Sequence, residues 1–364
     1  MKIYLQRPWK FADSPYYKYL LESPPEGVDY VGQAQKQGVI EKKWKFILIH
    51  RIKALIRKFF RVFSVPLPNA HLTKSSEKYD LIHCAHCLSI NNRPWVTDTE
   101  WVGQFWVAAN FDAHPKRHLV KRILENKNCK KIMAWTEWAA EGIFKEFPEI
   151  ADKVEVVYPG IPAPNFRKIK SDKIRMLYVS RRFYFKGGLY ALEVMDRITK
   201  KYPNTEGIIV SNVPQEVLEK YSNNKNLKFI DVIPQEKLFK KIYPSTDILV
   251  YPSFTDTFGF ALTEAMAFGI PVVTVGGLSR GEIVDDEKTG FVVRSPENFD
   301  SETLDKLLYK KIVDDLTEKV EILVKNEKLR EKMSISSRKE IKSGKFSIRK
   351  RNKKIKRIYD EALK

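Results

Sequence analysis

The sequence predicts an α/β protein made of two doubly wound lobes, each with a parallel sheet, with a cleft between them. Its 364 residues are enough for about two domains. Short apolar runs, typical of buried strands, alternate with amphipathic stretches, typical of helices. The alternation breaks at 159–173, where three prolines and a polar run stand together. We therefore place a lobe boundary there and expect a ligand in the cleft.

The expected strands are short apolar runs, and the expected helices are longer amphipathic patterns. In the first lobe the strands are 2–5, 79–85, 94–101, 130–136 and 154–159. In the second lobe they are 175–180, 207–211, 227–232, 247–253, 271–275 and 290–293. The helical patterns include 188–202, 260–269 and, at the end, 346–363.

Charge and cysteine content narrow the class of protein. Lys and Arg number 65 against 45 Asp and Glu, a formal net charge of +20. This charge attracts polyanions, whether nucleic acid, anionic membrane or phosphorylated substrates, and its sign does not choose among them. Three cysteines are an odd number for a disulfide framework, which favours a reducing compartment. Neither a signal peptide nor an apolar run of about 18 residues is present, so we expect a cytoplasmic protein.

The segment 251–273 carries the most informative pattern. A strand ends at Ser253, a loop carries Asp256, Gly259 begins a helix, and Glu264 lies inside that helix. A helix start in this position favours an anion, and the two carboxylates are suited to accept hydrogen bonds from hydroxyl groups near it. The alternative is a solvated glutamate and a loop aspartate beside an ordinary helix. Spacing alone leaves the two interpretations even.

A second segment, 179–188, places cations after a strand. Ser180 ends the strand, and Arg181, Arg182 and Lys186 follow before a helix opened by two glycines. Cations at the carboxyl end of a strand in an α/β lobe face the ligand crevice. Arginine and lysine together suit a diphosphate. The alternative is a solvated basic loop in a basic protein.

Together the two segments resemble the retaining GT-B glycosyltransferases with a glycogen-synthase-like C-terminal lobe, known as glycosyl transferases group 1. That family has a G-R-x4-K-G loop, which here reads Ser180-Arg181-Arg182-Phe183-Tyr184-Phe185-Lys186-Gly187. Its E-x-F-G-x4-E-A motif reads Asp256-Thr257-Phe258-Gly259 and continues to Glu264-Ala265. The resemblance covers nearly all of 174–364 and is weak over 1–160.

The resemblance implies a GT-B fold with two Rossmann-like lobes: 1–165 for the acceptor, 166–345 for the nucleotide sugar, and a terminal helix, 346–364, that packs back on the N-terminal lobe. Arg181 and Lys186 would stabilise the donor diphosphate in place of a divalent metal ion. Asp256 would contact the sugar, where the family usually has the longer glutamate. Donor-binding roles are implied for six further positions: Ser180, Ile233, Phe258, Gly259, Phe260 and Glu264, of which Glu264 would hold the ribose and Ile233 lies in the loop for the base.

In the N-terminal lobe the family often has a histidine after a strand of type V-V-T-x-H. The comparable strand here, 94–101, offers Asp98 and Glu100 instead. We expect Glu100 to orient the acceptor hydroxyl, with Asp98 as the alternate. The competing interpretation is that Glu100 is a surface residue at a strand end. Asp98-Thr99-Glu100 also imitates a metal-binding D-x-D, which we discount because the other lobe already supplies cations.

Two further segments have competing interpretations. The run HCAHC at 83–87 suggests zinc, but a structural site usually needs four ligands in two spaced pairs. A buried strand end, with His86 entering the cleft, is favoured. The stretch 42–63 places apolar residues on one helical face among many basic ones. It is either a helix that lies on an anionic membrane surface or a helix that packs the lobe.

The function predicted is transfer of a sugar from a nucleoside diphosphate sugar to a glycan or lipid-linked acceptor, with retention and with no metal or other cofactor. The expected partners are the nucleotide sugar, the acceptor and an anionic membrane surface on the cytoplasmic side. Alternatives are an epimerase or phosphorylase of the same fold, or a non-catalytic basic protein that binds nucleic acid or membrane. Basic patches interleaved with aromatics are not evident, which disfavours nucleic acid.

Overall fold

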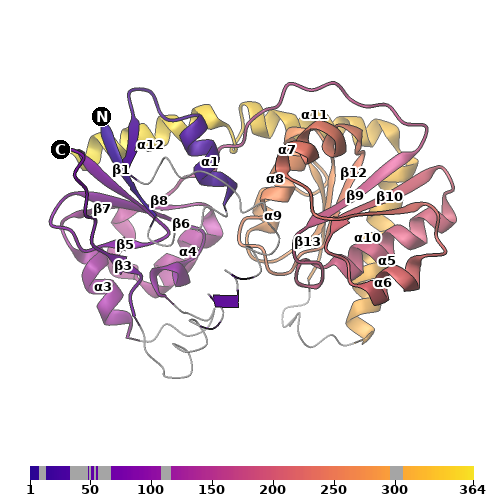
Figure 1. Cartoon of the computed structure of the whole chain (residues 1–364), viewed down its shortest axis with the longest axis horizontal. Coiled ribbons are helices and arrows are strands. Elements are labelled where there is room, and N and C mark those ends of the chain that lie inside the picture. Colours follow the sequence, from indigo (N-terminus) through magenta and orange to yellow (C-terminus); the bar gives the residue numbers. More distant parts are fainter. Residues whose placement is uncertain are drawn as a thin grey trace. The chain divides into compact units, whose positions relative to one another are not determined.

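The computed structural model divides the chain into two compact units. Unit 1 comprises Met1–Gly160 and Lys345–Lys364, and unit 2 comprises Ile161–Gly344. The first boundary falls within the proline-rich segment 159–173, and the second lies just before the terminal helix. The structure describes residues 1–7, 14–32, 67–107, 116–295 and 306–364, together with the single positions 48, 51, 52 and 55. Figure 1 shows the elements of each unit.

Unit 1 contains a six-stranded parallel sheet in the order β2-β1-β4-β6-β7-β8. The strands of the unit are β1 (Lys2–Gln6), β2 (Asp29–Gly32), β3 (Ala70–His71), β4 (Leu81–Ala85), β5 (Leu88–Ser89), β6 (Trp95–Thr99), β7 (Cys129–Ala134) and β8 (Val154–Val156). The short strands β3 and β5 pair separately. Its helices are α1 (Pro15–Glu22), α3 (Arg117–Glu125), α4 (Glu137–Glu146) and α12 (Ile348–Ala362), with 3₁₀ turns η2 (Val102–Phe105) and η3 (Pro148–Lys153).

Unit 2 contains a second six-stranded parallel sheet, ordered β11-β10-β9-β12-β13-β14. Its strands are β9 (Ile174–Ser180), β10 (Thr205–Ser211), β11 (Leu227–Ile230), β12 (Ile248–Tyr251), β13 (Val272–Val275) and β14 (Gly290–Val293). Its α-helices are α5 (Gly188–Lys201), α6 (Gln215–Tyr221), α7 (Gln235–Lys237), α8 (Phe260–Ala267), α9 (Arg280–Ile283), α10 (Lys306–Lys325) and α11 (Glu327–Lys342). Shorter helical turns are η4 (Tyr184–Lys186), η5 (Leu238–Ile242) and η6 (Tyr243–Ser245).

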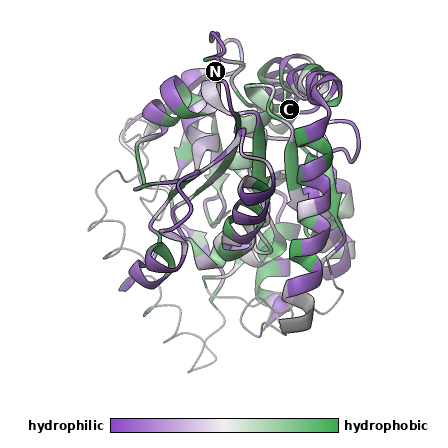
Figure 2. Ribbon diagram, turned by 90° about the vertical axis from the view of Figure 1, so that its right-hand side faces the viewer, coloured by the Kyte–Doolittle hydropathy of each residue, from purple (hydrophilic) through white to green (hydrophobic). Residues whose placement is uncertain are grey.

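Both sheets are buried on two faces, as their sequences predict. The strands β4, β6 and β12 are buried along their whole length, and near-continuous apolar runs are typical of parallel strands covered by helices. Figure 2 shows hydrophobic residues gathered on the strands and hydrophilic residues along the outer sides of the helices. The prediction of two doubly wound α/β lobes is confirmed, and every predicted strand overlaps an observed one. The strands β2, β3 and β5 were not predicted.

The terminal helix α12 completes the core of unit 1. Ile355, Ile358 and Tyr359 are at most 1% exposed, and α12 contacts β6 and β7. Arg351 is also buried, and its Nη2 donates a hydrogen bond to the carbonyl oxygen of Ser23, 2.6 Å away, just beyond α1. The residues that follow unit 2 in the chain therefore belong structurally to unit 1.

The strand orders define one switch point in each sheet. In unit 2 the order reverses between β9 and β12, and in unit 1 it reverses between β1 and β4. The crossovers on the two sides of such a point leave in opposite directions, which opens a crevice at the carboxyl ends of the two strands. In unit 2 the loops after Ser180 and Tyr251 meet there. In unit 1 the corresponding positions are Arg7 and His86.

Candidate functional site

In unit 2 the two sequence motifs meet at the switch point. Gly187 has a φ of 73°, a left-handed value that favours glycine. A β-carbon at this position would lie 2.0 Å from the carbonyl oxygen of Pro252. The loop after β9 can therefore approach the loop after β12 only because Gly187 has no side chain.

Lys186 and Asp256 form an ion pair across this junction. Lys186 Nζ donates a hydrogen bond to Asp256 Oδ1, and the hydroxyl of Tyr251 donates to Asp256 Oδ2 at 2.7 Å. Burial raises the pKa of Asp256, but the charge of Lys186 and the hydrogen bonds to the carboxylate outweigh burial, so its pKa is lowered. Asp256 is thus held as a carboxylate, and the two predicted residues act as one unit.

The other residues of the first motif divide into two groups. Arg181 follows β9 directly and is partly buried, and the side-chain amide of Asn212 donates to its carbonyl oxygen at 3.4 Å. Ser180 Oγ accepts a hydrogen bond from the backbone N–H of Arg182, 3.0 Å away, which tightens the turn. Arg182 is exposed and lies over the ring of Phe185, with its Cζ 3.8 Å from the ring centroid. Arg181 and Lys186 therefore remain the candidate phosphate ligands.

The second motif opens the helix α8. Gly259 is the N-cap, with a φ of 78°, and has no side chain to satisfy the first N–H groups of the helix. Phe258, 1% exposed, packs against Phe260 with ring centroids 4.8 Å apart. The start of α8 is therefore fixed by aromatic packing and presents the positive end of its dipole, as an anion site requires.

Glu264 lies inside α8 and is 6% exposed. Gln235 Nε2 donates to its Oε1 at 2.6 Å, and the Tyr243 hydroxyl donates to its Oε2 at 3.1 Å. Each carboxylate oxygen has two lone pairs, so these bonds orient Glu264 and leave it able to accept bonds from hydroxyl groups. Ile233 is half-buried between β11 and α7, in the loop that leads to Gln235.

Arg280 was missed by sequence reasoning and braces the site. It is 2% exposed, and its guanidinium donates to three carbonyl oxygens: Val275 at 2.9 Å, Gly276 at 2.8 Å and Asp256 at 3.0 Å. Burial lowers the pKa of Arg280 to about 10. The guanidinium ties the loop after β13 to the backbone of Asp256 and so holds the carboxylate in place.

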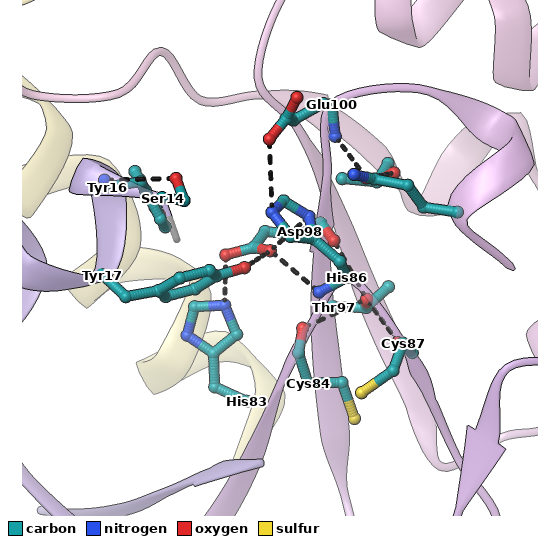
Figure 3. Close-up of polar contacts among 12 residues, drawn as sticks. Ser14, Tyr16, Tyr17, His83, Cys84, His86, Cys87, Thr97, Asp98 and Glu100 are labelled. Carbon is teal, nitrogen blue, oxygen red and sulfur yellow. Dashed lines mark hydrogen bonds and ion pairs between the residues drawn. The ribbon is translucent and has the colours of Figure 1, made fainter. Parts of the chain in front are cut away.

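In unit 1 the predicted residue Asp98 lies at the centre of a buried polar cluster (Figure 3). Its carboxylate is fully buried. The Tyr17 hydroxyl donates to Oδ1 at 2.5 Å, and His83 Nε2 lies 3.0 Å from Oδ2. The hydroxyl of Tyr359, on α12, is 2.6 Å from His83 Nδ1. Burial raises the pKa of Asp98, but the hydrogen bond and charge of His83, with smaller contributions from His86 and Tyr17, lower it overall.

His86 stands at the end of β4 between two carboxylates (Figure 3). Its Nδ1 is 3.4 Å from Asp98 Oδ1, and its Nε2 is 3.5 Å from Glu100 Oε1. Its φ of 53° is uncommon for a residue with a β-carbon, and such conformations cluster at functional sites. Its ring lies 5.4 Å from that of Tyr17 and 4.7 Å from that of Trp135, between centroids.

The predicted residue Glu100 is therefore brought together with His86. Its side chain is 22% exposed, and its backbone N–H donates to Gln104 Oε1 at 2.8 Å. Asp98, the alternate, is buried and acts on a ligand only through the groups it holds. The histidine that the family often places in this lobe is absent from the β6 segment, but His86 supplies one from the neighbouring strand β4.

The described residues contain neither a metal-binding cluster nor a membrane-spanning helix. Within the described ranges no group of three or more His, Cys, Asp or Glu side chains is arranged to hold a metal ion. Cys84, Cys87 and Cys129 are free and buried. Among the helices that the structure describes, none combines the length and apolar character needed to cross a membrane.

Comparison with solved structures identifies the class of fold. A glycosyltransferase from Rickettsia africae superposes with a TM-score of 0.67 and 15% identity, covering 100% of this chain and 98% of that one. The Anabaena protein HepE, solved with UDP and glucose, superposes with a TM-score of 0.63 and 13% identity, with 99% of both chains covered. The chain has the GT-B fold.

Sequence comparison gives the family. Residues 163–340 match the family described as Glycosyl transferases group 1. An uncharacterized glycosyltransferase from Methanocaldococcus jannaschii is 30% identical over 258 residues, which are 62% of this chain and 64% of that protein. Against this and two further curated relatives the chain spans 52% to 65% of the relative's length. The chain has the GT-B fold, and its residues 163–340 are similar to the glycosyl transferases group 1 family.

Proposed function

We propose that the chain is a retaining glycosyltransferase that moves a sugar from a nucleoside diphosphate sugar to an acceptor hydroxyl without a metal ion. The observation that carries this proposal is the pairing of Lys186 with Asp256 beside Arg181 at the switch point of unit 2. The pair joins a cation suited to a diphosphate to a carboxylate suited to sugar hydroxyls. The Anabaena neighbour solved with UDP and glucose supports a uridine diphosphate sugar as the first donor to test.

The proposed reaction breaks the bond between the anomeric carbon and the diphosphate oxygen. The bonding electrons leave with the diphosphate, whose growing negative charge is stabilised by Arg181, Lys186 and the start of α8. The acceptor oxygen forms the new bond on the same face, and its proton passes to the departing diphosphate. Lys186 has three donor hydrogens, so it can keep its bond to Asp256 while it reaches a phosphate oxygen.

The remaining residues have binding roles in this proposal. Glu264, oriented by Gln235 and Tyr243, accepts hydrogen bonds from the ribose hydroxyls. Ile233 packs against the base. Glu100 and His86, in unit 1, contact the acceptor. Because Asp256 is one methylene shorter than the glutamate usual in the family, the chain should prefer a donor whose hydroxyls suit the shorter reach.

The deciding experiment measures nucleoside diphosphate release. A panel of UDP-, GDP- and ADP-sugars is first screened by thermal shift, since a ligand at 100 times its dissociation constant adds about 2.7 kcal/mol of stability. The stabilising donor is then assayed with and without glycan and lipid-linked acceptors. Release that requires an acceptor supports transfer. Conversion of the donor without an acceptor, or release that requires inorganic phosphate, would instead establish an epimerase or a phosphorylase.

The acceptor is proposed to be lipid-linked or membrane-proximal, with the basic stretch 42–63 as the surface contact. Most of that stretch lies outside the described residues. The apolar residues that are described, Leu48, Ile52 and Leu55, have helical backbone and are 50%, 48% and 67% exposed. Exposed apolar positions among basic residues favour a surface helix over a packing helix. Liposome co-sedimentation should depend on anionic lipid and fall with salt, and equal binding to neutral vesicles would contradict this proposal.

A further inference from the structure

The switch point of unit 1 contains a buried arginine, Arg7, with a donor nitrogen that no described residue pairs. Arg7 follows β1 directly and is 7% exposed, and its Nη1 is buried without a hydrogen bond. The two other buried arginines, Arg280 and Arg351, donate to backbone carbonyl oxygens, although Arg351 Nη1 also lacks a hydrogen bond. A buried donor left unpaired has lost its hydrogen bonds to water and carries the full desolvation cost. A ligand that accepts a hydrogen bond from Arg7 would offset that cost.

The surroundings of Arg7 do not neutralise its charge. Its guanidinium lies over the ring of Tyr17, with Cζ 5.4 Å from the centroid. Burial lowers the pKa of Arg7, and the neighbour that opposes this effect is Tyr17 rather than a carboxylate. The hydroxyl of Tyr17 is already committed to Asp98. Arg7 is therefore free to bind an anion, and an arginine fork matches the oxygens of phosphate and carboxylate.

The second strand of the switch point supplies a second open group. His86 follows β4, and neither of its ring nitrogens makes a hydrogen bond, although both lie within ion-pair distance of carboxylates. The ring of Tyr17 contacts both the Arg7 guanidinium and the His86 ring, with a centroid separation of 5.4 Å from His86. The ring of Trp135, which follows β7, lies 4.7 Å from the His86 ring and 6.4 Å from the Tyr17 ring, between centroids. Cation, imidazole and aromatic faces thus share one edge of the sheet.

We infer that this edge of unit 1 binds an acceptor that carries an anionic group, with Arg7 as the ligand of the phosphate or carboxylate. The inference rests on the proposed function and names the chemical class of the acceptor. Glu100, whose Oε1 lies 3.5 Å from His86 Nε2, repels an anion and accepts hydrogen bonds from hydroxyls. The acceptor should therefore place its charged group at Arg7 and its neutral hydroxyl end toward Glu100.

The test uses three probes that differ in charge: glucose 1-phosphate, glucuronate and methyl glucoside. Calorimetric titrations are made at constant ionic strength with UDP at saturation, so that the phosphate ligands of unit 2 are occupied. We expect at least one anionic probe to bind about 10-fold more tightly than methyl glucoside. Preference for glucose 1-phosphate assigns a phosphorylated acceptor, and preference for glucuronate assigns an acidic sugar. Equal affinity for all three probes overturns the inference.

Substitutions at Arg7 test whether this residue is the ligand of the anionic probe. Arg7→Gln should lose the preference for the anionic probe and keep its affinity for UDP. Arg93→Gln is the matched control, because Arg93 also lies over a tyrosine, Tyr79, at 5.2 Å, but is exposed away from the switch point. Unchanged anion affinity in Arg7→Gln overturns the inference. If that variant does not fold, Arg7→Lys decides: retained preference with anion affinity weakened 3- to 10-fold supports a fork at this position, and no change contradicts it.

UDP binding is read separately in the same samples. A chain that binds UDP but shows no anion preference refutes only the acceptor inference. A chain that binds no nucleoside diphosphate at all refutes the proposed function instead.

Discussion

The two switch points differ in whether their charged side chains are already paired. In unit 2 the carboxylate of Asp256 is paired with Lys186, and Arg280 ties its backbone to the neighbouring loop. In unit 1 the cation of Arg7 and the ring nitrogens of His86 lack hydrogen-bond partners among the described residues. The charged side chains at the switch point of unit 2 are thus already paired, while those at the switch point of unit 1 retain unsatisfied nitrogen atoms.

This difference predicts which property, turnover or ligand affinity, mutations at each switch point should change. A preorganised charge cluster acts most strongly where charge develops in the transition state, so its loss should reduce turnover. Unsatisfied groups act chiefly by binding, so their loss should change affinity. The following predictions test this contrast, from the largest expected effect to the smallest.

Lys186→Met should cause the largest loss of turnover. Removing the cation that faces the departing diphosphate should lower kcat by about 10³-fold, the upper range for one preorganised group. Steady-state release of nucleoside diphosphate measures this effect. Lys220→Met is the matched control, since Lys220 also lies over an adjacent aromatic ring but is exposed. A loss below about 10-fold in Lys186→Met would remove the lysine from the chemical step.

Asp256→Asn should mainly lower turnover, whereas Glu264→Ala should mainly weaken nucleotide binding. Asp256→Asn should reduce kcat by about 10²-fold with nucleoside diphosphate affinity nearly unchanged, because its contact strengthens as the sugar reacts. Glu264→Ala should weaken binding of the free nucleotide by about 10-fold or more, the effect of losing hydrogen bonds to a charged group. Calorimetry with UDP alone, beside kinetics with the donor, separates the two. Equal losses of nucleotide affinity would contradict the separate sugar and ribose roles.

Asp98→Asn should reduce stability in a way that depends on pH. The pKa of Asp98 is lowered in the folded state, so its stabilisation is present above the unfolded value of about 3.9 and is lost as pH falls through the folded value. The variant should lose about 1–3 kcal/mol in the free energy of unfolding at pH 7. The difference from the natural chain should shrink in acid.

Urea denaturation at pH 7 and at pH 3 measures this difference. Asp80→Asn is the control, because Asp80 is exposed and accepts one hydrogen bond from the Lys2 backbone. A constant gap between Asp98→Asn and the natural chain at both pH values would show that Asp98 contributes through packing rather than charge.

Removal of divalent metal ions with EDTA should change neither donor binding nor turnover. In the proposed function Arg181 and Lys186 supply the positive charge that a divalent ion would provide, so we expect donor binding and turnover to survive EDTA. Activity lost on chelation and restored by manganese would overturn metal independence.

Most residues of the candidate site in unit 2 could be predicted from the sequence, because they lie in two short motifs. Each motif follows one strand, and the strands were predictable from apolar runs. Arg280 could not be predicted, because an arginine in a chain of net charge +20 looks like a surface residue. Only the folded loop shows that its guanidinium is enclosed by carbonyl oxygens.

The candidate site in unit 1 could be predicted from the sequence only in part. Glu100 lies near the end of a predicted strand, and its neighbour His86 was expected at a buried strand end and in the cleft, without a stated role. Arg7 and Tyr17 come from separate segments that topology alone brings together. The strands β2, β3 and β5 have two to four residues, too few for an alternating or continuous apolar pattern to stand out.

The position of α12 has a consequence for how the chain is made. Domains generally fold in the order in which the ribosome delivers them. Here unit 1 receives its last twenty residues, Lys345–Lys364, only after all of Ile161–Gly344 has been synthesised. Tyr359 then places its hydroxyl against His83, which in turn contacts Asp98. A chain that stops before Lys345 would therefore contain the loops of unit 2 but lack the helix that completes the histidine–aspartate cluster of unit 1.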